Sequence, residues 1–273
     1  MENKFLLFHN TKISYKTYGS GTAVVLIHGF GEDSSIWDEQ VAFLKEKYFL
    51  IVPDLPGTGE SEMLPILKAE IPDFAEVIKE VLSAENITKT IMIGHSMGGY
   101  ITLAFAEKYP EFLLAFGLVH SGAYADDNEK IKTRKKSIRF IEDNGSAAFL
   151  KTAIPGLFFD VKENAKEIDS LIMKGNVFNA DTLVQYYYAM INRPDRTETL
   201  RKMPYPVLFI IGEHDKAIPF EHSLQQSHMP AHAYIHILRN SAHMGMVEEA
   251  EKINEILAQF LHSCSLPPLR HTA

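Results

Sequence analysis

One serine in this sequence stands in a setting that could make its hydroxyl a nucleophile. The segment Gly94-His95-Ser96-Met97-Gly98 matches the pattern G-x-S-x-G. It follows an apolar, strand-like run at residues 90–93 and precedes a run of helical period, which is the strand–turn–helix context that the pattern requires. The two glycines suit a tight turn, and the first N–H groups of the helix would face a developing oxyanion. We therefore predict nucleophilic chemistry at Ser96.

Four further motifs resemble those of the α/β-hydrolase superfamily, and the resemblance covers nearly the whole chain outside one insertion and the tail. His28-Gly29-Phe30-Gly31 is similar to the family's oxyanion loop, and residues 54–61 are similar to its D-x-x-G-x-G-x-S turn. Gly212-Glu213-His214-Asp215 resembles the loop of the catalytic acid, and Ser241-Ala242-His243 resembles the loop of the catalytic histidine. The order Ser, Asp, His along the chain is the order expected of this fold.

The resemblance implies a catalytic triad of Ser96, Asp215 and His243. A serine hydroxyl attacks well only when a neighbouring base takes its proton. An imidazole can accept that proton and later return it to the leaving group, while a carboxylate holds the imidazole in the correct tautomer. The resemblance also implies that the backbone N–H groups of Phe30 and Met97 form the oxyanion hole.

Other acids and histidines near these motifs have simpler interpretations. Glu213 could replace Asp215 as the acid, but it lies closer to the end of its strand. We expect His95 to point away from the site and pack, and we expect His28 to be a structural loop histidine. His120-Ser121 contains no carboxylate, so the family's alternative position for the acid is not filled.

Neither a metal nor a cofactor is expected. The histidines at 228, 232 and 236 are loosely spaced around Pro230, which prevents a helical pair of ligands. Gly19-Ser20-Gly21 precedes a strand instead of following one, so it is not a dinucleotide fingerprint. The net charge of −8 argues against a general nucleic-acid binder, and no run reaches the roughly 18 apolar residues of a membrane span. With a single cysteine, we expect a cytoplasmic protein without an internal disulfide.

Short apolar runs alternate with segments of helical period, which predicts an α/β fold: a mostly parallel central sheet flanked by helices. We expect buried strands at residues 23–27, 49–52, 90–93, 113–119 and 207–211, a last strand at residues 234–238, and an antiparallel edge strand at residues 11–18. We expect helices at residues 36–46, 72–84, 97–108 and 247–261.

Residues 124–203 break this rhythm and contain helical patterns only. We predict a core domain of residues 1–123 and 204–262, a helical cap inserted between two core strands at residues 124–203, and a disordered tail at residues 263–273. In the resembled family such a cap covers the nucleophile. Aromatic side chains such as Phe158, Phe159 and Tyr187 would then line an acyl pocket, or they would pack the cap against the core.

The cap also contains a cluster of basic residues within one predicted helix. Its members are Lys130, Lys132, Arg134, Lys135, Lys136 and Arg139. Two interpretations stay open: a solvated helix face, or a patch that steers an anionic or carrier-linked acyl substrate toward an otherwise acidic protein.

The residue type at position 96, in the turn between the predicted strand and helix (the elbow), limits the reactions that the site could catalyse. Relatives that open epoxides or remove halides carry Asp there, whereas Ser96 favours acyl transfer. We expect a serine hydrolase that cleaves a carboxylic ester, lactone or thioester of a small molecule. A carbon–carbon bond hydrolase or lyase with the same triad is one alternative, and a slow-turnover ligand receptor of the same fold is another, because fold alone does not choose among them.

Overall fold

The fold is built on one eight-stranded sheet in the order β1-β2-β4-β3-β5-β6-β7-β8. The structure is a computed structural model and describes residues 1–66 and 68–265. The strands are β1 (Glu2–Phe8), β2 (Thr11–Tyr18), β3 (Thr22–Ile27), β4 (Tyr48–Pro53), β5 (Thr90–His95), β6 (Leu113–Val119), β7 (Val207–Gly212) and β8 (Ala233–Leu238). All neighbours from β4 to β8 pair in parallel, while β1 and β2 are antiparallel additions at one side. The predicted fold class is confirmed.

The sequence prediction missed β1. Its side chains alternate between exposed and half-buried, and Phe5 and Leu7 remain 67% exposed, so its short apolar run at residues 5–8 is not buried on both faces as the runs of the central strands are. The turn between β1 and β2 consists of His9 and Asn10, both with positive φ (48° and 65°), as in a two-residue hairpin. Residues 11–18 therefore form the second strand of the sheet and not its edge.

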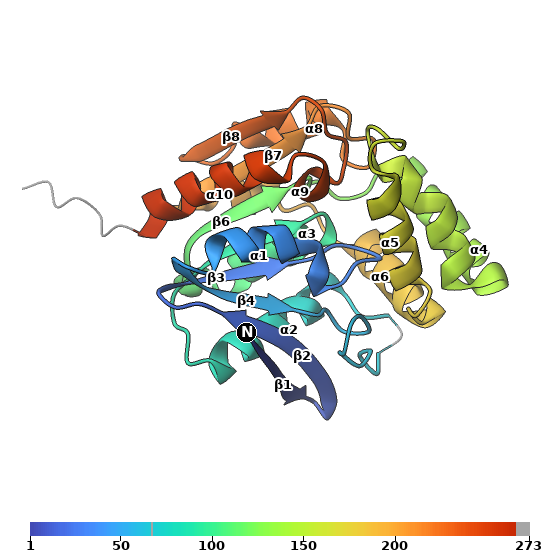
Figure 1. Ribbon diagram of the computed structural model, residues 1–273, viewed down its shortest axis with the longest axis horizontal. Coiled ribbons are helices and arrows are strands. Elements are labelled where there is room, and N and C mark those ends of the chain that lie inside the picture. The colour runs from blue at the N-terminus through green and yellow to red at the C-terminus, as the bar shows by residue number, and fades with distance from the viewer. Residues whose placement is uncertain (67, 266–273) are drawn as a thin grey trace, which may run out of the picture.

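Helices cover both faces of the sheet (Figure 1). On one face η1 (Ser34–Trp37) and α1 (Asp38–Leu44) lie beside α9 (Gly245–Glu248) and α10 (Ala250–Ser265). On the other face α2 (Ile71–Ala84) packs against α3 (Met97–Lys108), which η2 (Pro110–Phe112) follows, and α8 (Phe220–Ser227) lies against β7. The sequence predicts a disordered tail from residue 263, but α10 continues to Ser265, so the prediction is wrong for residues 263–265. Residues 266–273 lie outside the described residues.

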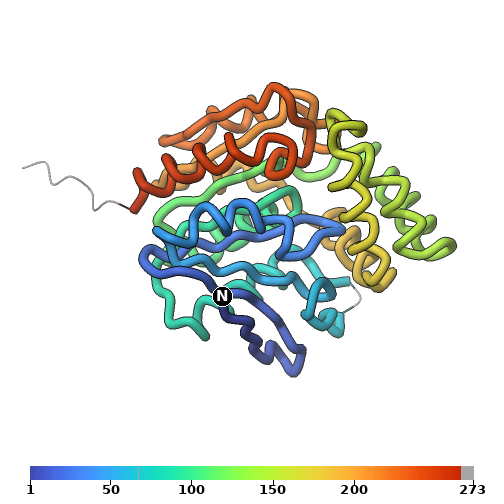
Figure 2. Tube along the Cα trace, viewed as in Figure 1, coloured from blue at the N-terminus to red at the C-terminus, as the bar shows by residue number. Residues whose placement is uncertain are grey.

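Between β6 and β7 the chain contains only helices. They are α4 (Asn128–Ala153), η3 (Ile154–Leu157), α5 (Ala165–Gly175), α6 (Ala180–Asn192) and α7 (Thr197–Lys202). Figure 2 shows α4, α5 and α6, coloured green to yellow, gathered to one side of the sheet. Side chains of α6 bond to core backbone: the Tyr186 hydroxyl donates to the Pro56 carbonyl (3.0 Å), and the Gln185 amide donates to the Leu64 carbonyl (3.0 Å). The division of the chain into core and cap domains at residues 124 and 203 stays a prediction.

The described helices include none that is both long enough and apolar enough to cross a lipid bilayer.

Candidate active site

The turn between β5 and α3 holds Ser96 in a backbone conformation that few residues adopt. Its φ is 49° and its ψ is −114°, and such a conformation costs on the order of 1–3 kcal/mol, which the surrounding structure must supply. A Cβ on Gly94 would lie 2.3 Å from the carbonyl oxygen of Gly98, and a Cβ on Gly98 would lie 2.4 Å from the carbonyl oxygen of Ile27. Both glycines are therefore required by close backbone packing around the serine.

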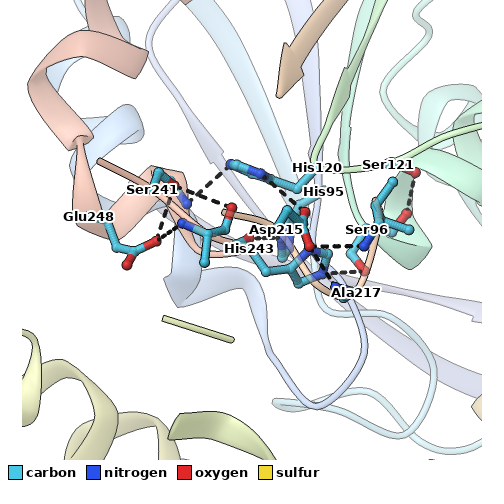
Figure 3. A network of polar contacts seen from close by, with 12 residues as sticks. His95, Ser96, His120, Ser121, Asp215, Ala217, Ser241, His243 and Glu248 are labelled. Carbon is cyan, nitrogen blue, oxygen red and sulfur yellow. Dashed lines mark hydrogen bonds and ion pairs between the residues drawn. The ribbon is translucent and has the colours of Figure 1, made fainter. Parts of the chain in front are cut away.

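Three side chains from three separate loops meet at this turn (Figure 3). The Oγ of Ser96 lies 2.9 Å from Nε2 of His243, and Nδ1 of His243 lies 2.8 Å from Oδ2 of Asp215. Ser96 follows β5, Asp215 follows β7, and His243 precedes α9. The structure thus brings together the three residues that the sequence motifs singled out.

Asp215 is buried and accepts hydrogen bonds on both of its oxygens. The backbone N–H groups of Ala217 (2.8 Å) and Ile218 (2.9 Å) donate to Oδ1, while His243 donates to Oδ2. Burial by itself raises the pKa of Asp215, but His243 and a second histidine, His120, outweigh it and hold the pKa well below its usual value. The group is therefore a carboxylate that orients His243 and does not take its proton.

His120 is a neighbour of the triad that the sequence analysis did not assign. Its Nδ1 lies 3.5 Å from Oδ2 of Asp215, and its Nε2 accepts from the N–H of Gly245 (3.2 Å). Burial lowers the pKa of His120 to about 4, so the ring is neutral at pH 7. Because Nε2 accepts, the single proton is on Nδ1 and faces Asp215.

A buried charged pair connects the loops around the site. Oε2 of Glu32 accepts from the N–H of Gly29 (2.7 Å) and from Nδ1 of His95 (3.0 Å), and Nε2 of His95 donates to the carbonyl oxygen of His243 (2.9 Å). Both ring nitrogens of His95 face acceptors, so the ring needs both protons. Burial lowers the pKa of His95 and raises that of Glu32, but their mutual attraction reverses both shifts, so the pKa of His95 is raised and that of Glu32 is lowered.

Sequence reasoning expected His95 only to pack and passed over Glu32. The position of Glu32 directly after the oxyanion motif was the one available signal. Together the two side chains link the loop after β3, the elbow and the histidine loop.

The two N–H groups expected to form the oxyanion hole belong to Phe30, in the loop after β3, and to Met97, at the start of α3. Among the described residues, none accepts a hydrogen bond from the N–H of Phe30, and Met97 is the first residue of α3, so its N–H has no intrahelical acceptor. Both groups are free to bind an oxyanion, and their catalytic role stays a prediction.

A cavity of about 700 Å³ lies between the triad and the inserted helices, with Ser96 and His243 in its wall. Tyr187 of α6 lines it, as predicted, and its ring packs against Phe30 with the centroids 4.4 Å apart. The other two aromatic residues predicted for the pocket do not line it. Phe158 is buried in the core, and Phe159 is 47% exposed and stacks on His214. Leu157, the last residue of η3, lines it instead.

Comparison with known proteins identifies the family of this chain. The model of the alpha/beta hydrolase family matches residues 24–256. The chain belongs to the α/β-hydrolase family. A curated relative, the 2-hydroxy-6-oxononadienedioate/2-hydroxy-6-oxononatrienedioate hydrolase of Paraburkholderia phymatum, is 25% identical over 262 residues, which are 92% of this chain and 91% of the relative.

Two solved structures of the family are similar in fold. A thermophilic esterase from Thermogutta terrifontis, in a malate-bound structure, has a TM-score of 0.91 and 23% identity, covering 97% of this chain and 100% of the esterase. The enol-lactonase from Burkholderia xenovorans has a TM-score of 0.88 and 20% identity, covering 95% of this chain and 100% of the lactonase.

The remaining candidates of the hydrolase site lie as follows. Glu213 is exposed, so it is Asp215 that faces His243. His28 is buried, and its Nε2 accepts from the N–H of Leu55 (2.9 Å). Within residues 1–66 and 68–265, the one cluster of three or more potential metal ligands is His120, Asp215 and His243. It shares Asp215 and His243 with the predicted triad, and the contacts already described account for it.

The basic cluster on α4 divides into two groups. Lys130 and Arg134 line the cavity, whereas the other four, Lys132, Lys135, Lys136 and Arg139, are exposed to solvent. Thr133 and Ser137 also line the cavity. They lie three positions after Lys130 and Arg134, respectively, and residues three positions apart share one helix face.

Proposed function

We propose that this α/β hydrolase cleaves a carboxylic ester, lactone or thioester through an acyl-Ser96 intermediate. One observation carries the proposal: the hydrogen-bonded chain from Ser96 through His243 to Asp215 opens onto a cavity of about 700 Å³. A cavity of this size accommodates a small-molecule substrate.

In the acylation half, Nε2 of His243 takes the proton of the Ser96 hydroxyl as Oγ attacks the carbonyl carbon. The negative charge that develops on the carbonyl oxygen is stabilised by the N–H groups of Phe30 and Met97, and one such donor contributes on the order of 10²–10³ in kcat. His243 then gives its proton to the leaving group. Asp215 stays ionised and stabilises the imidazolium.

In the deacylation half, His243 takes a proton from water, and the resulting hydroxide equivalent attacks the acyl carbon. The bond to Oγ of Ser96 breaks, and His243 returns the proton to Oγ. The Glu32–His95 pair supports both halves because it fixes the backbone of His243 and of the loop that carries Phe30.

Hydrolysis of p-nitrophenyl esters of increasing acyl length tests the proposal, with Ser96→Ala run in parallel. We expect p-nitrophenol release by the wild type, an optimum at a chain length that fits the cavity, and loss of turnover in the variant. Release that survives in Ser96→Ala would contradict the assignment of the nucleophile.

A second candidate, cleavage of a carbon–carbon bond, is supported by the curated relative whose name describes a hydrolase of a ring-opened dienedioate. The same triad would serve that reaction. Product analysis with a vinylogous 1,5-diketone as substrate separates the two: cleavage of the diketone without turnover of any ester would favour carbon–carbon hydrolysis.

A further inference from the structure

The cavity wall formed by α4 contains an arginine whose hydrogen-bonding capacity is only partly used. The side chain of Arg134 is 13% exposed, and its Nε donates to Oδ2 of Asp126 (2.5 Å) while its Nη2 reaches Oδ1 (3.4 Å). Asp126 therefore occupies the edge of the guanidinium that is formed by Nε and Nη2. A guanidinium has five N–H groups in a planar fork. The end edge, formed by Nη1 and Nη2, therefore has no carboxylate bound to it.

Little else competes for this end edge. Among the described residues, the one further hydrogen bond of Arg134 is from Nη1 to the thioether sulfur of Met190 (3.2 Å), which is a weak acceptor; the Tyr187 ring lies against the guanidinium, 5.6 Å from its central carbon, and accepts no hydrogen bond from it. The arginine lines the cavity between Thr133 and Ser137. Two parallel N–H groups at the end of a guanidinium match the two oxygens of a carboxylate.

The charges around Asp126 favour an anion at this point. Asp126 also pairs with Nη1 of Arg193 (2.9 Å), whose side chain is 5% exposed. Arg193 also donates hydrogen bonds within the protein, to the backbone carbonyls of Met190 (2.7 Å) and Tyr124 (2.9 Å). One buried carboxylate thus pairs with two guanidinium groups and can neutralise only one of their two positive charges.

The acidic residues that line the cavity are engaged elsewhere. Glu32 pairs with His95, Asp127 caps α4 by accepting from the N–H of Lys130 (2.7 Å), and Asp195 accepts from the N–H of Thr197 (2.9 Å). The Nζ of Lys130, on the same face of α4 as Arg134, donates to the carbonyl of Ala217 (2.8 Å) and adds positive charge to the wall.

We propose that the end edge of Arg134 binds a carboxylate of the substrate. The preferred substrates are then acyl compounds that carry a second, ionised carboxyl group, such as monoesters of dicarboxylic acids. This inference rests on the proposed acyl transfer at Ser96 and specifies its substrate class.

The test compares substrates that differ only in this charge. Monomethyl esters of the dicarboxylic acids from succinate to suberate are paired with methyl esters of monocarboxylic acids of equal chain length, for example monomethyl adipate with methyl hexanoate. For each pair, the ratio of kcat/KM for the charged ester to that for the neutral ester is measured.

We expect Arg134→Gln to lower this ratio by about 10- to 150-fold at the best chain length, the range for loss of a hydrogen bond to a charged group. Arg134→Lys keeps the charge but loses the fork, so the ratio should fall less. Lys135→Gln is the matched control: it removes one positive charge from the exposed side of the same helix and should leave the ratio unchanged. A ratio that Arg134→Gln leaves unchanged, or that Lys135→Gln lowers equally, would overturn the proposal.

Adipate binding, measured by calorimetry on wild type and variants, separates this inference from the proposed function. If a neutral ester is hydrolysed in a Ser96-dependent way and neither the ratio nor adipate binding responds to Arg134, the hydrolase stands and the carboxylate site is refuted. If no ester is turned over but Arg134→Gln weakens adipate binding by 10-fold or more, the carboxylate site stands and acyl transfer is refuted. If Arg134→Gln fails to fold, Arg134→Lys decides by the same two readouts, and an unchanged ratio with unchanged binding refutes the site.

Discussion

Replacing Glu32 by Gln removes the charge of the buried pair while preserving the shape of the side chain. A single oxygen, Oε2, accepts from both Gly29 and His95, and the amide oxygen of Gln can take that position. The change therefore leaves a buried imidazolium without its counter-ion. Breaking a buried ion pair in this way costs roughly 3–5 kcal/mol, which corresponds to a Tm lower by roughly 6–20 °C for a chain of about this size.

The pH dependence of this loss follows from the two pKa shifts. The lowered pKa of Glu32 gives stability that is present above its ordinary value of 4.5 and is lost as the pH falls through the folded value. The raised pKa of His95 gives stability that is fully present below its ordinary value of 6.5 and is lost as the pH rises through the folded value. The difference in unfolding free energy between wild type and Glu32→Gln should therefore be largest between about pH 4.5 and 6.5 and shrink at higher pH.

Urea denaturation at a series of pH values measures this difference. Glu39→Gln, which removes an exposed carboxylate on α1, is the control and should change stability by less than about 0.5 kcal/mol. We expect kcat to fall by less than the 10²–10³ of a lost oxyanion donor, because Gly29 keeps its acceptor. Equal stability of Glu32→Gln and wild type at pH 5.5, or a loss that does not vary with pH, would refute the charged pair.

Three further substitutions test the site. Asp215→Asn should keep the fold near neutral pH but lower kcat by about 10⁴, because the amide stabilises the wrong tautomer of the base; a loss under tenfold in steady-state kinetics would remove Asp215 from the triad. Gly98→Ala places a Cβ 2.4 Å from a backbone oxygen of β3 and should lower Tm strongly, whereas Gly156→Ala, with nothing within 4 Å of the added Cβ, should not; equal Tm values in thermal denaturation would contradict the close packing of the elbow. Tyr187→Leu should shift the acyl-length optimum toward longer esters because Tyr187 lines the cavity, while Phe159→Leu should leave it in place; the reverse pattern would mean that the cavity does not hold the acyl chain.

The parts of the fold that the sequence predicts are those with a strong local signal. The central strands are continuous apolar runs, and the strand from residue 113 to 119 was predicted with the bounds of β6. The elbow combines a spacing pattern with a strand before it and a helix after it, so Ser96 could be placed from local residues. Asp215 and His243 depend on loops far apart in the chain, and they were found through resemblance and not through local physics.

The features that the sequence missed depend on three-dimensional packing. Glu32 and His95 are 63 residues apart, and neither position signals a partner. The inward direction of Arg134, in contrast to Lys135, follows from the rotation of α4 against α6 and not from a pattern of basic residues. Phe158 and Phe159 have the composition expected of a pocket, but the end of η3 decides which way each side chain points.

Formation of an acyl bond at Ser96 is the claim on which the account most depends, and it can be observed directly. The wild type and Ser96→Ala are mixed with a p-nitrophenyl ester of the best acyl length, quenched in acid within the first turnovers, and analysed by intact-protein and peptide mass spectrometry. We predict one acyl group per chain, located on the peptide that contains Ser96 and missing from the variant. An acyl group on another residue, or one that persists in Ser96→Ala, would contradict the account.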